Sequence, residues 1–199
     1  MPEKFRNKYR IDTIRLKNYD YSANGYYFIT ICTKNRLHYF GKIIDQKMEL
    51  SEIGKIAHKC WLEIPNHFPF VILDEFAIMP NHIHGIVIIN KKEKRQSVGV
   101  ETPVEAQDLS VEAQDFVSPP SSPVPPPQSK NTFGPQSKNL ASIIRGFKVG
   151  VKKYATINNI DFAWQSKYYE HIVRNEKALN RIRQYIQNNP LNWVNDKNN

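Results

Sequence analysis

The alternation of apolar and polar positions along the chain predicts a protein built from both strands and helices. Four stretches rich in aromatic and β-branched residues predict strands, the last of them after a short connection: 25–33, 70–79, 82–90 and 163–173. Pro80 and Asn81 separate the second stretch from the third, and both are good turn formers. We therefore expect these two strands to pair as antiparallel neighbours.

Three further segments have apolar side chains at helical spacing: 51–65, 140–154 and 175–190. Ser51 and Asn175 are suitable N-caps, and Pro65 and Pro190 are expected to end the first and the third helix. Strands and helices mixed in this order around a mostly antiparallel sheet predict an α+β fold.

Residues 96–138 differ in composition from the rest of the chain. They are rich in Pro, Ser and Gln and almost free of aliphatic periodicity, so they cannot bury enough apolar surface to order themselves. We predict a flexible insert over 96–138. Residues 1–95 and 139–199 together would then form one folded domain.

The charge balance favours a polyanionic partner. The chain has 28 Lys and Arg against 19 Asp and Glu, a net charge of +9. Arg145, Lys148 and Lys152 line one side of the helix predicted over 140–154, which makes them candidates for DNA phosphate contacts. A merely solvated helix face explains the same stripe equally well.

Other classes of protein are disfavoured by what the sequence lacks. No apolar run reaches the roughly 18–20 residues of a membrane span, and the charged N-terminus is unlike a secretory signal, so we expect a cytoplasmic protein with no membrane partner. Cys32 and Cys60 lie in a predicted strand and a predicted helix, and both are expected in the core rather than in a disulfide or a zinc site.

The stretch MPNHIHGIVII (79–89) places two histidines inside a predicted strand. Because successive side chains of a strand point to opposite faces, His82 and His84 lie side by side on one face. Neutral imidazole is a common metal ligand, so the pair is a candidate cation site. Two hydrogen-bonded core histidines fit the same spacing.

The last predicted helix carries a second candidate group. Tyr185 and Asn189 are four residues apart, so their side chains lie on one face, one turn apart. Asn189 precedes Pro190, where helical geometry is disfavoured, and should therefore lie at the helix end. If that end docks over the histidines, Asn189 adds an oxygen ligand and Tyr185 stands beside the cation as a nucleophile. A half-buried structural tyrosine is the alternative.

These stretches resemble a known family. MPNHIHGIVII followed by RIRQYIQNNP, with YYFITICT before them and LASIIRGFK and WQSKYYEHIVRNE between them, closely resembles the REP-associated tyrosine transposases of bacteria, which are single-tyrosine HUH transposases. The resemblance covers nearly the whole chain except the insert, which is longer than this family leads one to expect. It implies a ferredoxin-like, RRM-like HUH palm.

The resemblance also implies roles for the candidate residues. His82 and His84 would hold a divalent ion, Mg²⁺ or Mn²⁺, and Asn189 would complete the metal site. Tyr185 would attack single-stranded DNA and form a 5′-phosphotyrosine, leaving a free 3′-hydroxyl. The implied protein is a metal-dependent single-stranded DNA endonuclease and strand transferase acting at hairpins of repeated palindromes. It would be nucleoid-associated, and either a monomer or a homodimer.

Other interpretations of the same residues stay open. Tyr168 and Tyr169 are rival nucleophiles, although neither has an amide four residues later on a helix, and His171 is a further polar candidate. A non-catalytic RRM-like nucleic-acid-binding protein would stack bases on aromatic residues of the first strand: Tyr26, Tyr27 and Phe28. A zinc hydrolase would need a third ligand, for which Asp74 and Glu75 are the candidates.

Overall fold

A four-stranded antiparallel sheet organises the part of the chain that the computed structural model describes, which is residues 16, 19–91, 137–196 and 198. The strand order is β4-β5-β1-β6, and every neighbouring pair is antiparallel. The bounds of the four strands are β1 (Gly25–Cys32), β4 (Val71–Ile78), β5 (His82–Ile89) and β6 (Tyr169–Val173). The predicted pairing of 70–79 with 82–90 is confirmed.

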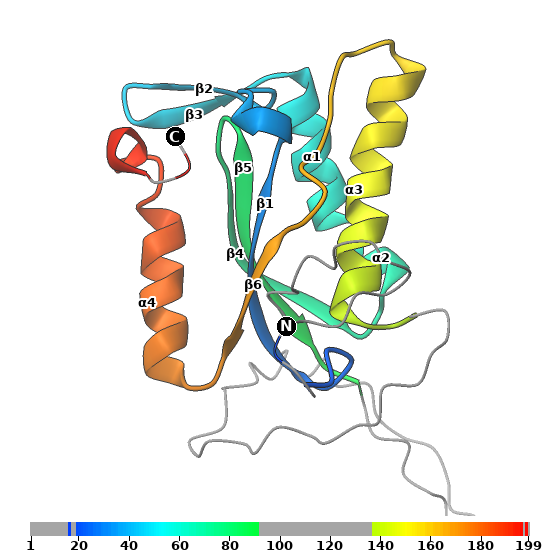
Figure 1. Ribbon diagram of the computed structural model, residues 1–199. Coiled ribbons are helices and arrows are strands. Elements are labelled where there is room, and N and C mark those ends of the chain that lie inside the picture. The colour runs from blue at the N-terminus through cyan, green and yellow to red at the C-terminus, as the bar shows by residue number, and fades with distance from the viewer. Residues whose placement is uncertain (1–15, 17–18, 92–136, 197, 199) are drawn as a thin grey trace, which may run out of the picture.

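Helices cover both faces of this sheet (Figure 1). Two long helices, α1 (Glu52–Leu62) and α3 (Leu140–Ile157), lie on one face together with the short α2 (Ile64–His67). The last helix, α4 (Glu176–Gln187), lies alone on the opposite face. The α+β prediction is thereby confirmed.

The alternation of β5 divides its side chains between two apolar cores. Ile83 and Val87 point into the larger core under α1 and α3, where Trp61 and Phe147 are also buried. Ile86 points the other way, into a smaller core under α4 formed with four other buried residues: Tyr26, Val173, Leu179 and Ile186. His82 and His84 share the face of Ile86, because the period of a strand is two.

Helix boundaries follow the predicted caps but not both predicted stops. The side chains of the predicted caps Ser51 and Asn175 each accept a hydrogen bond from the backbone at the start of their helix, and Asn139, which was not predicted as a cap, does the same for α3. Pro65 does not end the first helix, contrary to expectation, because α1 already stops at Leu62. Pro65 instead lies in the first turn of α2, where a missing N–H costs no hydrogen bond.

A small hairpin was not predicted from the sequence. It consists of β2 (Gly41–Ile44) and β3 (Lys47–Leu50), which pair only with each other. Asp45 and Gln46 form its turn with positive φ angles of 48° and 62°. The strands are four residues long and the turn has no glycine, so neither periodicity nor turn chemistry marked it.

Both stretches flanking the predicted insert contribute to the one sheet, since β6 pairs with β1. The insert itself lies outside the described residues except for its last two positions.

Cys32 and Cys60 are free thiols and only partly buried. Within the described ranges, none of the helices has the length and apolarity that crossing a membrane would demand.

Gly85 allows the close approach of Trp61 to the sheet, which gives a test of the packing. A Cβ added at Gly85 would lie 2.3 Å from Trp61 Cζ2, whereas one at Gly146 in α3 would meet Phe68 at an ordinary 3.4 Å. Gly85→Ala should therefore lower the free energy of unfolding by about 1–3 kcal/mol. Gly146→Ala, the control, should raise it by up to about 1 kcal/mol. Urea denaturation measures both, and an unchanged midpoint for Gly85→Ala would contradict this packing.

Candidate active site

The two histidines lie side by side at the start of β5, as predicted. Their Nε2 atoms are 3.0 Å apart, and both side chains are buried. His82 lies opposite Cys32 and His84 opposite Thr30 on the neighbouring β1. The pair shares the α4 face of the sheet with Ile86. The start of β5 lies at the end of the sheet where the hairpin and the C-terminal segment also lie (Figure 1).

Asn81 fixes the ring of His82. Its Nδ2 donates to two backbone carbonyls, those of Arg36 at 3.2 Å and Asn198 at 2.7 Å. Carbonyls only accept, so the amide oxygen must face the other way, where it lies 2.8 Å from His82 Nδ1. The proton of His82 is thus on Nδ1, and the lone pair of the neutral ring is on Nε2.

Thr30 supports His84 from the other side. Its hydroxyl lies 2.8 Å from His84 Nδ1 and can either donate or accept. When it accepts, His84 also carries its lone pair on Nε2, so both Nε2 atoms can serve one cation. Burial lowers the pKa of His82 to about 4, which keeps it neutral near pH 7. A metal ligand needs that neutral form.

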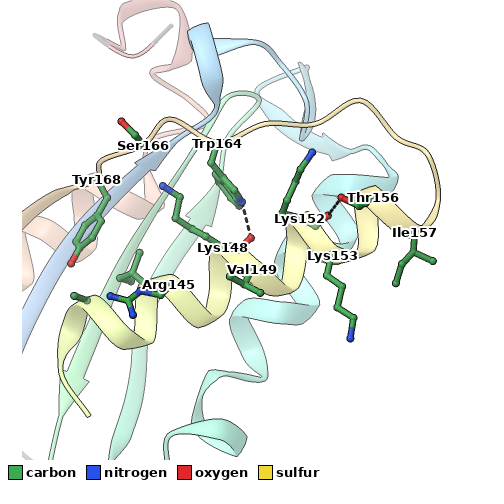
Figure 2. A pocket seen from close by; sticks show the side chains of 12 residues that line it. Arg145, Lys148, Val149, Lys152, Lys153, Thr156, Ile157, Trp164, Ser166 and Tyr168 are labelled. Carbon is green, nitrogen blue, oxygen red and sulfur yellow. Dashed lines mark hydrogen bonds between the residues drawn. The ribbon is translucent and has the colours of Figure 1, made fainter. Parts of the chain in front are cut away.

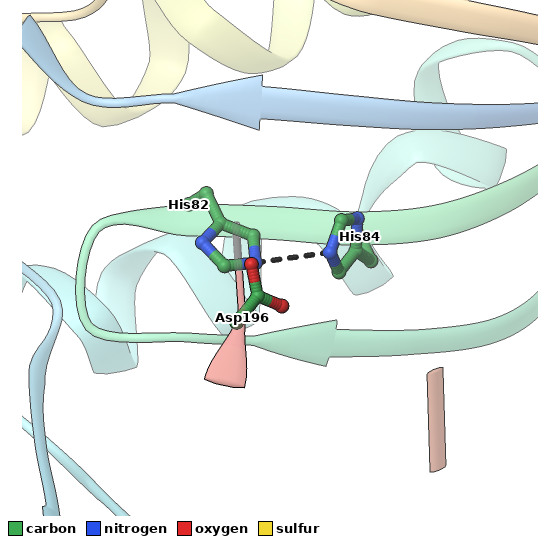
Figure 3. A group of neighbouring side chains, drawn as sticks. All are labelled: His82, His84 and Asp196. Carbon is green, nitrogen blue, oxygen red and sulfur yellow. Dashed lines mark hydrogen bonds between the residues drawn. The ribbon is translucent and has the colours of Figure 1, made fainter. Parts of the chain in front are cut away.

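Asp196 joins the pair from the C-terminal segment (Figure 3). One ligand atom from each of His82, His84 and Asp196 lies within 4.8 Å of the others, so the group could hold a metal ion. Burial raises the pKa of Asp196, but hydrogen bonds from Asn198 and Asn189 and the nearby imidazoles outweigh this and hold it below its ordinary value. The carboxylate is therefore charged near pH 7.

Asn189, the predicted amide ligand, lies against this group through Asp196. It lies just after α4, is buried, and donates from Nδ2 to Asp196 Oδ2 at 2.8 Å. Its Oδ1 is buried and makes no hydrogen bond within the described residues. The Asn189 amide lies near His82 and acts to raise the pKa of that imidazole, against the larger effect of burial. Its Oδ1 does not reach hydrogen-bonding geometry with the ring.

Tyr185 lies at the edge of the group. Its hydroxyl is 3.1 Å from His84 Nε2 and 3.5 Å from Asp196 Oδ2. Tyr185 is 40% exposed and lines an open hollow, so an external substrate can reach its side chain. Burial of the remainder raises its pKa to about 12, and the phenol is protonated near pH 7.

A polar hollow of about 480 Å³ opens beside Tyr185. Arg181 is its one Lys or Arg among the described lining residues. Besides the buried Asn189, four of the other lining side chains are amides that can pair with base edges: Gln184, Asn188, Asn192 and Asn195. The hollow thus places the guanidinium group of Arg181 and several hydrogen-bonding amides beside Tyr185.

An ion pair anchors α4 over the sheet and so positions Tyr185. Arg183 donates to both oxygens of Asp74 on β4, from Nε at 2.9 Å to Oδ1 and from Nη2 at 2.6 Å to Oδ2. Gln187 donates to Glu75 at 2.9 Å on the same strand. Asp74 and Glu75, considered as zinc ligands, are thus engaged with α4 and are not part of the histidine group.

The rival tyrosines lie on β6 or directly before it, not on α4. Tyr169 lies on β6 opposite Thr30 and is 51% exposed, with its ring 6.3 Å from that of Phe28. Tyr168 lines a hollow beside α3. His171 is exposed on β6. Of the candidate nucleophiles, Tyr185 has its hydroxyl 3.1 Å from Nε2 of His84 in the histidine pair.

The aromatic run on β1 does not form an open stacking surface. Tyr27 is fully buried under α3 and Tyr26 is 5% exposed under α4. Phe28 is half-buried and packs against His84 and Tyr185, with ring centroids 5.4 and 6.2 Å away. Two of the three aromatic residues considered for base stacking are therefore core residues.

The predicted basic stripe lies on α3, across the sheet from the histidines (Figure 1). Lys148 donates to the Gln165 carbonyl at 2.5 Å, and Lys152 donates to that of Phe162 at 2.6 Å. These two lysines thus tether the connection between α3 and β6. Arg145 is exposed on the same helix.

Comparison with known proteins gives a relative by sequence and a relative by fold. The chain is 42% identical over 186 residues to an uncharacterized protein of Haemophilus influenzae, covering 93% of this chain and 91% of the other. No family model matches. A REP-associated tyrosine transposase, whose structure was determined bound to a REP hairpin, superposes with a TM-score of 0.54 at 15% identity. That match covers 92% of this chain and 74% of the transposase, and it shows a shared fold.

The anchor of α4 can be tested by stability. Arg183→Gln removes both hydrogen bonds from Asp74, whose side chain is only 9% exposed, so it should cost about 1–3 kcal/mol of unfolding free energy. The double variant Arg183→Gln/Asp74→Asn should recover part of that loss, because no unpaired carboxylate is left. Arg181→Gln on the exposed side of α4 is the control. Guanidinium denaturation with equal costs for Arg183→Gln and Arg181→Gln would contradict the anchor.

Proposed function

Because the chain belongs to the same family as the uncharacterized Haemophilus influenzae protein and has the fold of a tyrosine transposase, we propose that it is a transposase of the single-tyrosine HUH type. In this proposal it cleaves and rejoins single-stranded DNA with Tyr185 as its nucleophile. The observation that carries the proposal is the position of the Tyr185 hydroxyl, 3.1 Å from His84 Nε2 at the mouth of a buried two-histidine group.

The donor set fits a divalent ion. His82 and His84 offer two Nε2 lone pairs, Asp196 offers a carboxylate oxygen, and Asn189 offers an amide oxygen that is buried without a hydrogen bond. Nitrogen and oxygen donors of this kind suit Mn²⁺, and Mg²⁺ when water or a phosphate supplies further oxygens. Such an ion, when bound, polarises a phosphodiester and neutralises charge that develops on its oxygens.

In the proposed cleavage step, Tyr185 would attack a phosphodiester of the DNA. The Tyr185 oxygen attacks phosphorus, a bond between them forms, and the bond from phosphorus to the 3′ oxygen breaks. The phenol proton passes to Asp196 Oδ2, which the hydroxyl reaches at 3.5 Å, and the leaving 3′ oxygen takes a proton from solvent. The 5′-phosphotyrosine conserves the energy of the bond, so a second 3′-hydroxyl can reverse the step without an external energy source.

The substrate we propose is a DNA hairpin with a single-stranded flank. The transposase with the same fold was captured on a REP hairpin. In this chain the hollow beside Tyr185 offers Arg181 for a phosphate, and amide side chains such as Gln184 and Asn188 for the edges of unpaired bases. Unpaired bases expose their Watson–Crick edges, whereas a duplex uses these edges for its own base pairs.

A metal-dependent hydrolase is the second candidate function. Two histidines and one carboxylate also form a common zinc ligand set, and Asp196 supplies the third ligand that Asp74 and Glu75 do not. Such an enzyme would use a metal-activated water and would leave no covalent bond between Tyr185 and its product. The detection of a covalent intermediate therefore separates the two functions.

The nucleophile is tested by trapping the covalent intermediate. Wild-type protein with Mn²⁺ and a labelled hairpin from the repeats near its gene should give a protein–DNA band on a denaturing gel. Tyr185→Phe should give none, because it lacks the attacking oxygen. Tyr169→Phe, which removes a more exposed tyrosine hydroxyl from β6, should retain the band. Cleavage by wild type without any covalent band would favour the hydrolase.

The metal site is tested by stability and binding together. At a Mn²⁺ concentration about 100 times its Kd, linkage stabilises the chelator-treated protein by about 3 kcal/mol, which should raise Tm by several degrees. His82→Ala and His84→Ala should lose this shift and metal-dependent cleavage while still binding the hairpin. His171→Ala, an exposed histidine on β6, is the matched control. A full Tm shift and cleavage in the two variants would contradict the assignment.

A further inference from the structure

Two hollows meet on the α3 side of the sheet, away from Tyr185. The first, of about 740 Å³, lies between α3 and the connection that leads to β6 (Figure 2). The second, of about 640 Å³, lies beside the short 3₁₀ turn Lys34–Arg36 that follows β1. Trp164 and Ser166 line both, so the two hollows are neighbours, and together they are called the track.

The charge of this track is of one sign. The first hollow is lined by four basic side chains: Arg145, Lys148, Lys152 and Lys153. The second adds Lys34 and Arg36. Among the described residues that line the track, none is acidic. A concave surface with a single sign of charge concentrates a ligand of the opposite sign.

Lys148, Lys152 and Trp164, which line the first hollow, are held in place by contacts with one another and with the connection. The ammonium groups of Lys148 and Lys152 donate to carbonyls of the connection, and that of Lys148 also lies over the Trp164 ring at 5.6 Å. The Trp164 ring in turn donates from Nε1 to the Lys148 carbonyl (Figure 2). An ammonium group has three donors, so each lysine keeps N–H groups for a ligand. Val149 is 58% exposed on the same surface and provides an apolar contact.

At its Lys34–Arg36 end, the track lies next to Asn81 of the candidate active site. The carbonyl of Arg36 accepts a hydrogen bond from Asn81, whose amide oxygen orients His82. At the other end, Arg145 and Lys153 are eight residues apart, about 12 Å along α3. A stacked DNA strand carries a phosphate about every 3.4 Å, so this length matches three or four phosphates.

We infer that this track binds the sugar-phosphate backbone of the single-stranded DNA that continues from the cleaved position. The inference rests on the proposed function and deepens it, because it assigns a path to DNA beyond Tyr185. A groove with basic sides and an apolar floor suits a single strand, whose phosphates meet the basic groups while its bases and sugars lie on the floor. Lys148 and Lys152 then have two roles, since they shape the groove and also carry part of its charge.

The test compares binding of two DNAs by charge-reversal variants. Arg145→Glu/Lys153→Glu changes two exposed residues, so the fold should survive, as an unchanged Tm would verify. For a hairpin with a single-stranded flank, we expect Kd by fluorescence anisotropy to rise about tenfold, and the salt slope to shrink by about 0.7 for each lost contact. For the bare hairpin, Kd should change much less. Lys177→Glu on α4 is the control of equal charge change per site and should bind both DNAs as wild type does.

Three results would overturn the inference. The first is an unchanged Kd for the flanked hairpin, and the second is an equal loss for Lys177→Glu, which would indicate a general charge effect. The third is loss of binding to a polyglutamate peptide with DNA affinity intact, which would assign the track to an acidic protein segment. Because these measurements need no cleavage, failure of the covalent trap with wild type would refute the proposed function separately.

Discussion

The burial of β5 on both faces is the constraint on which the rest of the structure depends. One face carries Ile83 and Val87 under α1 and α3, and the other carries the histidines and Ile86 near α4. Because the strand is covered on both sides, the imidazoles lose solvent and the pKa of His82 falls to about 4. A surface pair would be partly protonated near neutral pH, whereas this buried pair keeps the lone pairs that a cation requires.

The two helix layers, one on each face of the sheet, have different roles. On the side of α1 and α3 lies the larger core, in which Trp61 packs against Gly85 of β5. This core stabilises the face of the sheet opposite the histidines. The α4 side is a lighter layer, anchored by the Arg183–Asp74 pair, and it presents Tyr185 and Asn189 to the histidines. The chain then returns after α4 to bring Asp196 into the same group. One strand and one terminal segment thus supply the group that could hold a metal ion, and the partly exposed Tyr185 lies at its edge.

Much of this arrangement could be predicted from the sequence, because it depends on periodicity. The alternation of β5 placed His82 and His84 on one face, and helical spacing placed Tyr185 near Asn189. Asp196 was missed because it follows Pro190 in a segment with no periodicity, and only the tertiary return of the chain brings it to the histidines. The role of Asn81 was also missed, because a turn residue gives no sign that its amide orients a ring. The tethering of the α3 connection by Lys148 and Lys152 depends on carbonyls that no sequence pattern marks.

We propose that His82, His84, Asn189 and Asp196 form one cation site in front of Tyr185. Anomalous diffraction at the manganese edge, from crystals of the full chain grown with Mn²⁺, tests this most directly. We predict an anomalous peak at about 2.0–2.4 Å from both Nε2 atoms, with Asp196 or Asn189 supplying oxygen. Ordered side chains in this group with no peak between the two imidazoles, or manganese bound only elsewhere on the protein, would contradict the account.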